Sequence, residues 1–119
     1  MIRISDNELK ERAKKVKYFF SDIDGTLTDG TSVYTANGEY AKSFSLRDGA
    51  GVYLLKKTGI EVGFITGENS EIVQKRAEKL KLKYCFSGID NKLQCMSDFC
   101  SNLNITLDEI GRASCRERV

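Results

Sequence analysis

An apolar run that ends in two closely spaced carboxylates constrains the fold of this chain more than any other feature. Residues 17–21 form a strand-like segment, and Asp22 and Asp24 follow it directly, ahead of a turn residue, Gly25. A bend at Gly25 lets both carboxylates converge at the carboxyl end of the strand. Open α/β sheets bind their ligands at this edge. The segment therefore predicts a buried strand that brings two acids to a ligand site.

The rest of the chain alternates between helix-like and strand-like segments. Apolar periodicity and capping residues predict helices over residues 5–15, 48–58, 69–81 and 91–103. Further strands are expected at 60–66 and 84–86, and an Asn-Gly pair predicts a hairpin between 32–34 and 40–44. Strands that alternate with helices indicate right-handed βαβ units and a parallel sheet. The sequence predicts a single small α/β domain.

Charge and composition exclude several classes of function. The net charge of +2 is too small to indicate a nucleic-acid or membrane partner. No segment approaches the roughly 18 apolar residues of a membrane span, and the first residues do not resemble a signal peptide. We therefore expect a cytoplasmic protein. The 119 residues include no histidine, which excludes Ser-His and Cys-His nucleophile pairs.

Groups that suit a phosphate follow the two later strands. Thr66 and Gly67 offer a hydroxyl and an accessible amide, and Lys92 offers a cation at the start of a helix. Asp22 is the candidate nucleophile, which would form an aspartyl-phosphate, and Asp24 is the candidate acid–base group. Mg²⁺ between Asp22 and the phosphate would offset the repulsion between the two anions. The pattern predicts phosphoryl-transfer chemistry.

Each of these motifs also has a purely structural interpretation. Residues 22–25 can form a surface turn, residues 66–67 another turn, and Lys92 can be a solvated lysine. Their joint occurrence, one at each successive strand end, favours a catalytic site. A phospho-accepting receiver domain is an alternative, since it also has acids and a lysine at strand ends. Receivers phosphorylate an aspartate after the third strand, where this chain has Ser87 and Gly88.

In their order and spacing, these motifs resemble those of the haloacid dehalogenase superfamily. D-x-D-G-T at residues 22–26, Thr66 and Lys92 correspond to its first three motifs. Residues 24–30, 45–49 and 90–93 resemble one branch more closely. That branch comprises the 3-deoxy-D-manno-octulosonate 8-phosphate phosphatases and relatives that act on nonulosonate (sialic-acid-type) 9-phosphates. The resemblance extends from about residue 17 to residue 110.

The resemblance implies a Rossmann-like parallel sheet in the order 5-4-1-2-3, with an inserted β-hairpin and no cap domain. It also implies a Mg²⁺-dependent phosphatase that acts on a small sugar-acid phosphate. Such proteins form homotetramers in which hairpins of neighbouring subunits close the active site. By the same resemblance, Asp22 and the backbone carbonyl of Asp24 hold Mg²⁺, and the catalytic residues are Asp22, Asp24, Thr66 and Lys92.

The resemblance also implies a set of substrate-binding residues. They are Asp24, Ser45, Leu46, Arg47, Asp48, Gly49, Gly67, Glu68, Arg76, Lys79 and Lys92. The octulosonate enzymes typically have arginine in place of Glu68, and Glu68 with Arg76 and Lys79 is more similar to the nonulosonate enzymes. Arg76 and Lys79 are i,i+3 neighbours that can bind a sugar carboxylate or form a solvated charged face. Both substrates stay open.

The carboxyl-terminal end departs from the family pattern. A fourth motif, a strand that ends in Gly-Asp-Asp with a Mg²⁺-ligating aspartate, should follow Ile110, but the sequence continues Gly-Arg-Ala-Ser-Cys. We therefore expect residues 1–110 to be an incomplete phosphatase domain without its last strands. Residues 111–119 are expected to be a non-native tail, with a native basic tail as the alternative.

Two consequences follow from this departure. Loss of a metal ligand predicts that the 119-residue chain is weakly active or inactive, and a non-catalytic assembly or regulatory domain is the alternative function. Loss of the fourth strand predicts that residues 17–21 form an exposed apolar edge with unpaired backbone groups.

Overall fold

The computed structural model of the chain describes residues 5–113. Its main sheet is parallel, in the order β5 (Tyr84–Phe86), β4 (Glu61–Ile65), β1 (Tyr18–Ser21) and β6 (Ile110–Ala113). A separate antiparallel pair is formed by β2 (Val33–Thr35) and β3 (Gly38–Ala41). The helices are α1 (Asp6–Lys14), α2 (Leu46–Lys57), α3 (Glu71–Lys79) and α4 (Lys92–Leu103), with a 3₁₀ turn η1 (Leu107–Glu109). The predicted α/β class and the inserted hairpin are confirmed.

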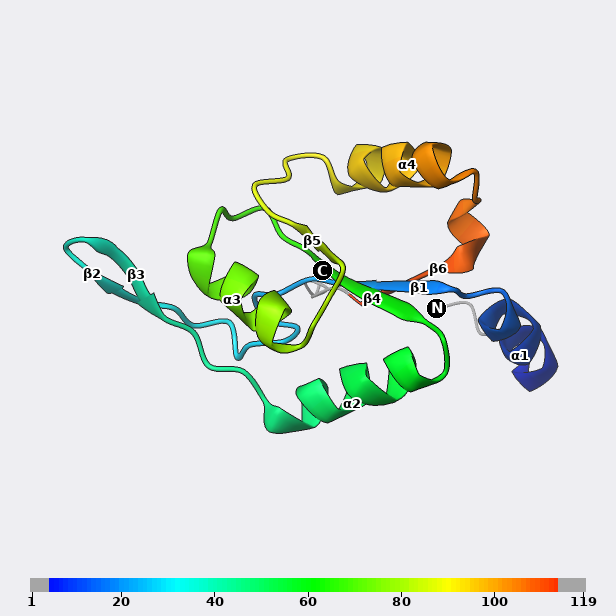
Figure 1. Ribbon diagram of the computed structural model, residues 1–119, viewed down its shortest axis with the longest axis horizontal. Coiled ribbons are helices and arrows are strands. Elements are labelled where there is room, and N and C mark those ends of the chain that lie inside the picture. The colour runs from blue at the N-terminus through cyan, green and yellow to red at the C-terminus, as the bar shows by residue number, and fades with distance from the viewer. Residues whose placement is uncertain (1–4, 114–119) are drawn as a thin grey trace.

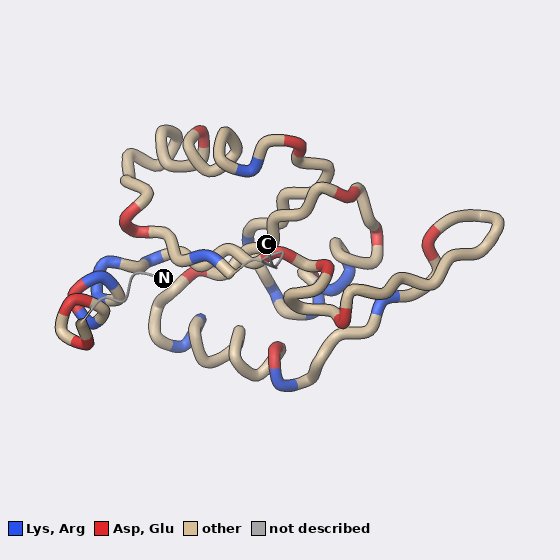
Figure 2. Tube along the Cα trace, turned by 180° about the vertical axis from the view of Figure 1, so that it is seen from behind, with Lys and Arg blue, Asp and Glu red and all other residues tan. Residues whose placement is uncertain are grey.

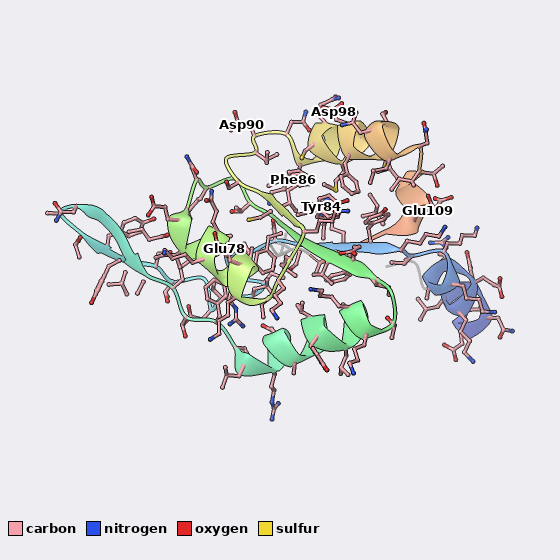
Figure 3. All side chains as sticks on the ribbon, in the orientation of Figure 1. Glu78, Tyr84, Phe86, Asp90, Asp98 and Glu109 are labelled. Carbon is pink, nitrogen blue, oxygen red and sulfur yellow. The ribbon has the colours of Figure 1, made fainter. Side chains whose placement is uncertain are left out.

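Helices cover the main sheet on both faces (Figure 1). α4 covers one face, over a core of Phe20, Ile65, Met96 and Phe99. α2 and α3 lie on the other face, where the core contains Ile23, Phe64, Val73 and Ala77. Figure 3 shows the side chains of Tyr84 and Phe86 in the layer between β5 and α4. The ring of Phe99 packs edge-on there, 4.9 Å from Tyr84 and 5.1 Å from Phe20 between ring centroids.

Short-range signals locate most helix ends. The side chains of Ser5, Ser70 and Asn91 cap α1, α3 and α4 by accepting hydrogen bonds from backbone amides in the first turn. The predicted start of α2 at Asp48 is wrong, because Ser45 is the cap and accepts from the Arg47 amide at 3.2 Å. Ser45 has the extended backbone of a cap, and Asp48 instead lies in the first turn, where a carboxylate favours the helix dipole.

The predicted exposed edge of β1 is also wrong. β6 pairs in parallel with β1, so that Ser21 lies opposite Ala113, and the Asp22 amide donates to the Ala113 carbonyl at 2.9 Å. Ladder bonds use backbone groups that every non-proline residue carries, so the absence of an apolar pattern did not prevent pairing. Gly111 aids the approach, since a Cβ there would lie 3.2 Å from the Phe19 ring.

Numbered by their order along the chain, the four parallel strands lie side by side in the order 3-2-1-4, which agrees with the corresponding part of the implied order 5-4-1-2-3. The expectation that the fourth strand is missing is wrong. Residues 114–119 lie outside the described part, and the non-native origin of residues 111–119 stays a prediction.

The charged surface shows no preference for one sign along α1. Lysine, arginine, aspartate and glutamate alternate along this helix (Figure 2). Arg12 pairs with Glu8 at 2.9 Å and Lys14 with Glu11 at 3.3 Å, all on exposed side chains. Such pairs contribute about 0–1 kcal/mol each.

Within residues 5–113, none of the helices has the length and apolar character needed to cross a membrane.

Candidate active site

Two of the predicted catalytic residues form an ion pair at the carboxyl edge of the sheet. Asp22 follows β1, and Lys92 is the first residue of α4. The Lys92 ammonium contacts Asp22 Oδ1, and the two side chains are 28% and 16% exposed, respectively. The Asn91 cap fixes the start of α4 and with it the origin of the lysine. The pair therefore places a carboxylate and a cation together at a site that a ligand can reach.

A tight turn anchors the two acids. The amides of Thr26, Leu27 and Thr28 all donate to the Ile23 carbonyl, at 2.9–3.2 Å, and the Ile23 side chain is buried. Gly25 has φ of 76°, a left-handed conformation that glycine adopts without steric cost. The Thr28 hydroxyl accepts from the amides of Gly25 and Gly30. The bend expected after the first strand is confirmed.

Thr66 also lies at this edge, at the end of β4. It is 4% exposed, and its amide donates to the Phe86 carbonyl at 2.9 Å. Its hydroxyl accepts from the Glu68 amide at 3.3 Å. A Cβ on Gly67 would lie 3.5 Å from the Ile89 carbonyl, which is ordinary contact. Thr66 and Gly67 thus form a well-supported loop beside the first strand.

A lysine that the sequence analysis missed joins this site. The Lys42 ammonium lies 2.7 Å from Asp24 Oδ1, 3.0 Å from Glu39 Oε2 and 3.6 Å from Glu68 Oε2, and it donates to Ser32 Oγ at 2.7 Å. The Lys42 side chain is fully buried. Lys42 follows the last residue of β3, and Tyr40, two residues before it, is 62% exposed. Strand alternation therefore gives no signal for the burial of this lysine.

The charges of this cluster stabilise one another. Burial alone would lower the pKa of Lys42, but hydrogen bonds and charges from Asp24 and Glu39 outweigh it and raise the pKa above its ordinary value. For Glu39, burial acts to raise the pKa, while Ser70 and Lys42 lower it by more. Ser70 Oγ donates to Glu39 Oε1 at 2.5 Å. Both ionised forms are therefore favoured in the folded protein.

Arg76 contacts the segment that was expected to bind substrate. Its guanidinium donates to the Ser45 carbonyl at 3.3 Å and lies 5.2 Å from the centroid of the Phe44 ring. A Cβ on Gly49 would lie 3.2 Å from Arg76 Nη2. Leu46, on the same segment, is 82% exposed. The structure thus brings the start of α2 and the last turn of α3 together.

Arg47 and Asp48 lie closer to the catalytic turn. They line a cavity of about 440 Å³ whose walls include Ser21 and Thr26. Thr26 Oγ1 is buried and has no hydrogen-bond partner among the described residues. The first turn of α2 therefore borders the turn that carries the two acids.

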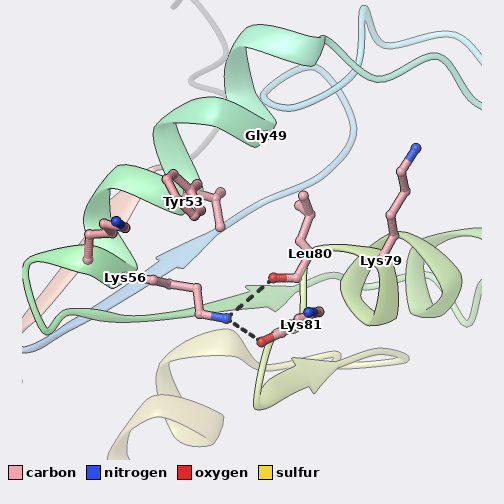
Figure 4. A pocket seen from close by; sticks show the side chains of 8 residues that line it. Gly49, Tyr53, Lys56, Lys79, Leu80 and Lys81 are labelled. Atoms are coloured by element: carbon pink, nitrogen blue, oxygen red, sulfur yellow. Dashed lines mark hydrogen bonds between the residues drawn. The ribbon is translucent and has the colours of Figure 1, made fainter.

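Lys79 lines a separate cavity of about 420 Å³ between α2 and α3, whose walls include Gly49, Tyr53 and Lys56 (Figure 4). Lys56 donates to the carbonyls of Leu80 and Lys81 there. Lys79 lies in the last turn of α3, as does Arg76. Lysines in a last helical turn offset the partial charge of the helix end. The structure does not bring Lys79 and Asp22 together.

The oxygen donors near Asp22 fit magnesium, although the set is small. The Asp22 carboxylate and the Asp24 backbone carbonyl are hard oxygen ligands, and Mg²⁺ usually binds through one or two carboxylates and several waters. Ser21 Oγ donates to the Asp22 carbonyl at 2.8 Å, which fixes the backbone before the turn. Within residues 5–113, no group of three or more Asp, Glu, Cys or His side chains could hold a metal ion. The described residues thus supply two of the implied ligands.

Known phosphatases are similar to the chain in sequence. The 3-deoxy-D-manno-octulosonate 8-phosphate phosphatase of Haemophilus influenzae is 34% identical over 101 residues, which are 85% of this chain and 56% of that protein. The enzyme of the same name from Escherichia coli K12 is 33% identical over 99 residues, 83% of this chain and 53% of the relative. No family model matches the chain.

A solved structure shows the same similarity in three dimensions. The 3-deoxy-D-manno-octulosonate 8-phosphate phosphatase from Moraxella catarrhalis, in complex with a magnesium ion, a phosphate ion and a KDO molecule, superposes with a TM-score of 0.84. It is 35% identical, and the match covers 91% of this chain and 62% of that one.

The chain spans about half the length of the curated relatives it matches. Over that part, the sequence identity and the structural superposition indicate the same kind of relative. Over the part of their length that it spans, the chain is therefore homologous to the 3-deoxy-D-manno-octulosonate 8-phosphate phosphatases.

Proposed function

We propose that the protein represented by this chain is a Mg²⁺-dependent phosphatase of a 2-keto-3-deoxy sugar acid. The substrate is 3-deoxy-D-manno-octulosonate 8-phosphate or a nonulosonate 9-phosphate. The observation that carries the proposal is the ion pair of Asp22 and Lys92 at the carboxyl edge of the sheet. The metal, phosphate and sugar acid held by the Moraxella catarrhalis relative support the same chemistry.

The reaction proceeds in two displacements on phosphorus. A carboxylate oxygen of Asp22 attacks, the bond from phosphorus to the sugar oxygen breaks, and Asp24 gives its proton to that leaving oxygen. Water then attacks the aspartyl-phosphate, Asp24 takes the proton of the water, and inorganic phosphate leaves. Lys92 offsets negative charge on the transferring group, and the Thr66 hydroxyl and Gly67 amide orient its oxygens.

Magnesium would bind to the Asp22 carboxylate and the Asp24 backbone carbonyl. When bound, it supplies positive charge that reduces the repulsion between the nucleophile and the phosphate. The protein's own groups provide the remaining steps.

The identity of the sugar acid depends on residues around the loop after β4. The named relatives act on the octulosonate, whereas Glu68, Arg76 and Lys79 are more similar to the nonulosonate enzymes. In the structure, the Glu68 carboxylate faces Lys42 at 3.6 Å, and its side chain is 51% exposed. Glu68 can therefore reach a sugar hydroxyl while it stays near the acid–base group.

The alternative function is a non-catalytic assembly or regulatory domain. It is favoured by the sequence after β6, where Ser114 and Cys115 stand in place of the acids of the fourth motif. On the leading proposal, the complete protein is a cytoplasmic homotetramer without a nucleic-acid or membrane partner, and the 119-residue chain is weakly active or inactive.

Phosphate release from both sugar-acid phosphates tests the proposal. The 119-residue chain is measured beside a form extended through the natural sequence after Ile110, with and without Mg²⁺. We expect turnover by the extended form, none by its Asp22→Asn variant, and a preference that identifies the sugar acid. An extended form that folds, binds Mg²⁺ and releases no phosphate from either compound would support the non-catalytic alternative.

A further inference from the structure

Lys42 occupies a position that a lysine rarely takes. Charged side chains are almost never fully buried unless they are paired, because removal of an ammonium from water is costly. The Lys42 side chain has no exposed surface, yet three carboxylates lie within 4 Å of its ammonium. A single ammonium faces three carboxyl groups. The cluster is thus held together by this one cation.

We propose that Lys42 is a positioning residue for the acid–base carboxylate: it fixes Asp24 and links its orientation to the β2–β3 hairpin and to the loop after β4. The proposal rests on the proposed phosphatase function and goes beyond it, because nothing in the motifs of the family assigns this lysine. Lys42 does not touch the reacting atoms in this scheme; it acts through Asp24.

The contact with Asp24 is the central step. The Lys42 ammonium lies 2.7 Å from Asp24 Oδ1, a distance typical of a charge-assisted hydrogen bond. The Asp24 side chain is 36% exposed, so one of its oxygens is held while the carboxyl group remains accessible to a substrate. Without the lysine, a partly exposed aspartate has free rotation about its side-chain bonds. A proton donor must lie within hydrogen-bond reach of the leaving oxygen, so this freedom reduces acid catalysis.

The same ammonium connects three separate segments. Glu39 belongs to β3, Ser32 precedes β2, and Glu68 follows β4. Glu39 in turn accepts from Ser70, the cap of α3. A movement of the hairpin therefore acts on Asp24 through two short contacts. The hairpin position and the orientation of the acid are coupled in this way.

A comparison of two phosphate esters with different leaving groups separates a loss of acid positioning from general damage to the site. A sugar alkoxide needs protonation as it leaves, whereas p-nitrophenolate does not. In the extended form, we expect Lys42→Met to lower kcat/KM for the preferred sugar-acid phosphate by about 10–100-fold, a part of the roughly 10²–10⁴-fold of a general acid. The loss for p-nitrophenyl phosphate should be less than about 3-fold, because that reaction does not use the acid.

Lys56→Met is the matched control. Lys56 also connects two segments through its ammonium, since it lies in α2 and donates to the carbonyls of Leu80 and Lys81, which follow α3. We expect this variant to leave both rates unchanged. Should Lys42→Met fail to fold, Lys42→Gln retains a hydrogen-bond donor without the charge. We expect this variant also to lose more kcat/KM for the sugar-acid phosphate than for p-nitrophenyl phosphate.

Hydrogen exchange of the 119-residue chain tests the positioning without any turnover. Lys42→Met should speed exchange about tenfold or more at the Leu27 and Thr28 amides, which donate to the Ile23 carbonyl, while Lys56→Met should not. Equal exchange in the two variants, or an equal loss for both phosphate esters, would overturn the proposal. Failure of the wild-type extended form on every ester would instead reject the phosphatase function, and the exchange result would still decide the role of Lys42.

Discussion

Gly63 in the middle of β4 is a site where one methyl group should weaken the whole sheet. In the register of the sheet it lies opposite Phe20 of β1 and Tyr84 of β5. A Cβ at this position would lie 2.5 Å from Phe20 Cε1 and 2.9 Å from Tyr84 Cβ. Separations below 3.0 Å between such atoms require one of the groups to move.

Neither neighbour can move easily. Phe20 is 1% exposed, and its ring centroid lies 5.1 Å from that of Phe99 and 5.8 Å from that of Phe86. The Tyr84 Cβ is attached to the backbone of the adjacent strand. Overpacking of a core typically costs about 1–3 kcal/mol. We expect Gly63→Ala to lower the free energy of unfolding by about 2 kcal/mol, after the small gain from a less flexible unfolded chain.

Urea unfolding of the 119-residue chain measures this effect. With a slope of about 2 kcal/mol per molar, the midpoint should fall by about 1 M with no change in slope. Gly51→Ala is the control, since its Cβ meets nothing within 4 Å and Gly51 lies inside α2. We expect that change to raise the free energy of unfolding by about 0.5–1 kcal/mol. A Gly63→Ala midpoint equal to or above that of the wild type would refute the packing argument.

Three further changes test the site. Lys92→Met removes the cation beside Asp22, and in the extended form we expect kcat to fall by about 10²–10³-fold, measured as phosphate release; retention of wild-type kcat would contradict its role. Glu39 has a lowered pKa in the folded protein, so its ionised form stabilises the fold above pH 4.5 and this contribution is lost as the pH falls through the folded pKa. Glu39→Gln should therefore flatten the acid-side slope of stability against pH in urea titrations, and an unchanged slope would argue against the cluster. Glu68→Arg should shift the ratio of kcat/KM toward the octulosonate phosphate, and an unchanged ratio would show that specificity lies elsewhere.

Much of the local structure follows from neighbours in the sequence. The strand before Asp22 and the start of α4 at Asn91 were predicted and are present. These features depend on residues within a few positions, so a single sequence contains their cause. The meeting of Asp22 and Lys92 was also predictable, because parallel strands place their carboxyl ends at one edge.

Other features depend on residues that are distant in the chain. The partners of Lys42 lie 18 residues before it at Asp24 and beyond the next helix and strand at Glu68, so no local pattern indicates the cluster. Lys79 was grouped with Arg76 by helical spacing, but α3 carries the two toward different surroundings. Helical spacing predicts which side chains share one face of a helix, but it does not predict which residues that face contacts.

The sequence by itself determined the α/β class, the position of the two acids after the first strand, and the family relationship. Only the tertiary structure decided that β6 covers β1, that Lys42 joins Asp24 to the hairpin, and that Lys79 lies away from the Asp22–Lys92 pair. The physical reason is the range of the interactions. Caps, turns and apolar periods act over a few residues, whereas backbone pairing and buried charges act between any segments that the fold brings together.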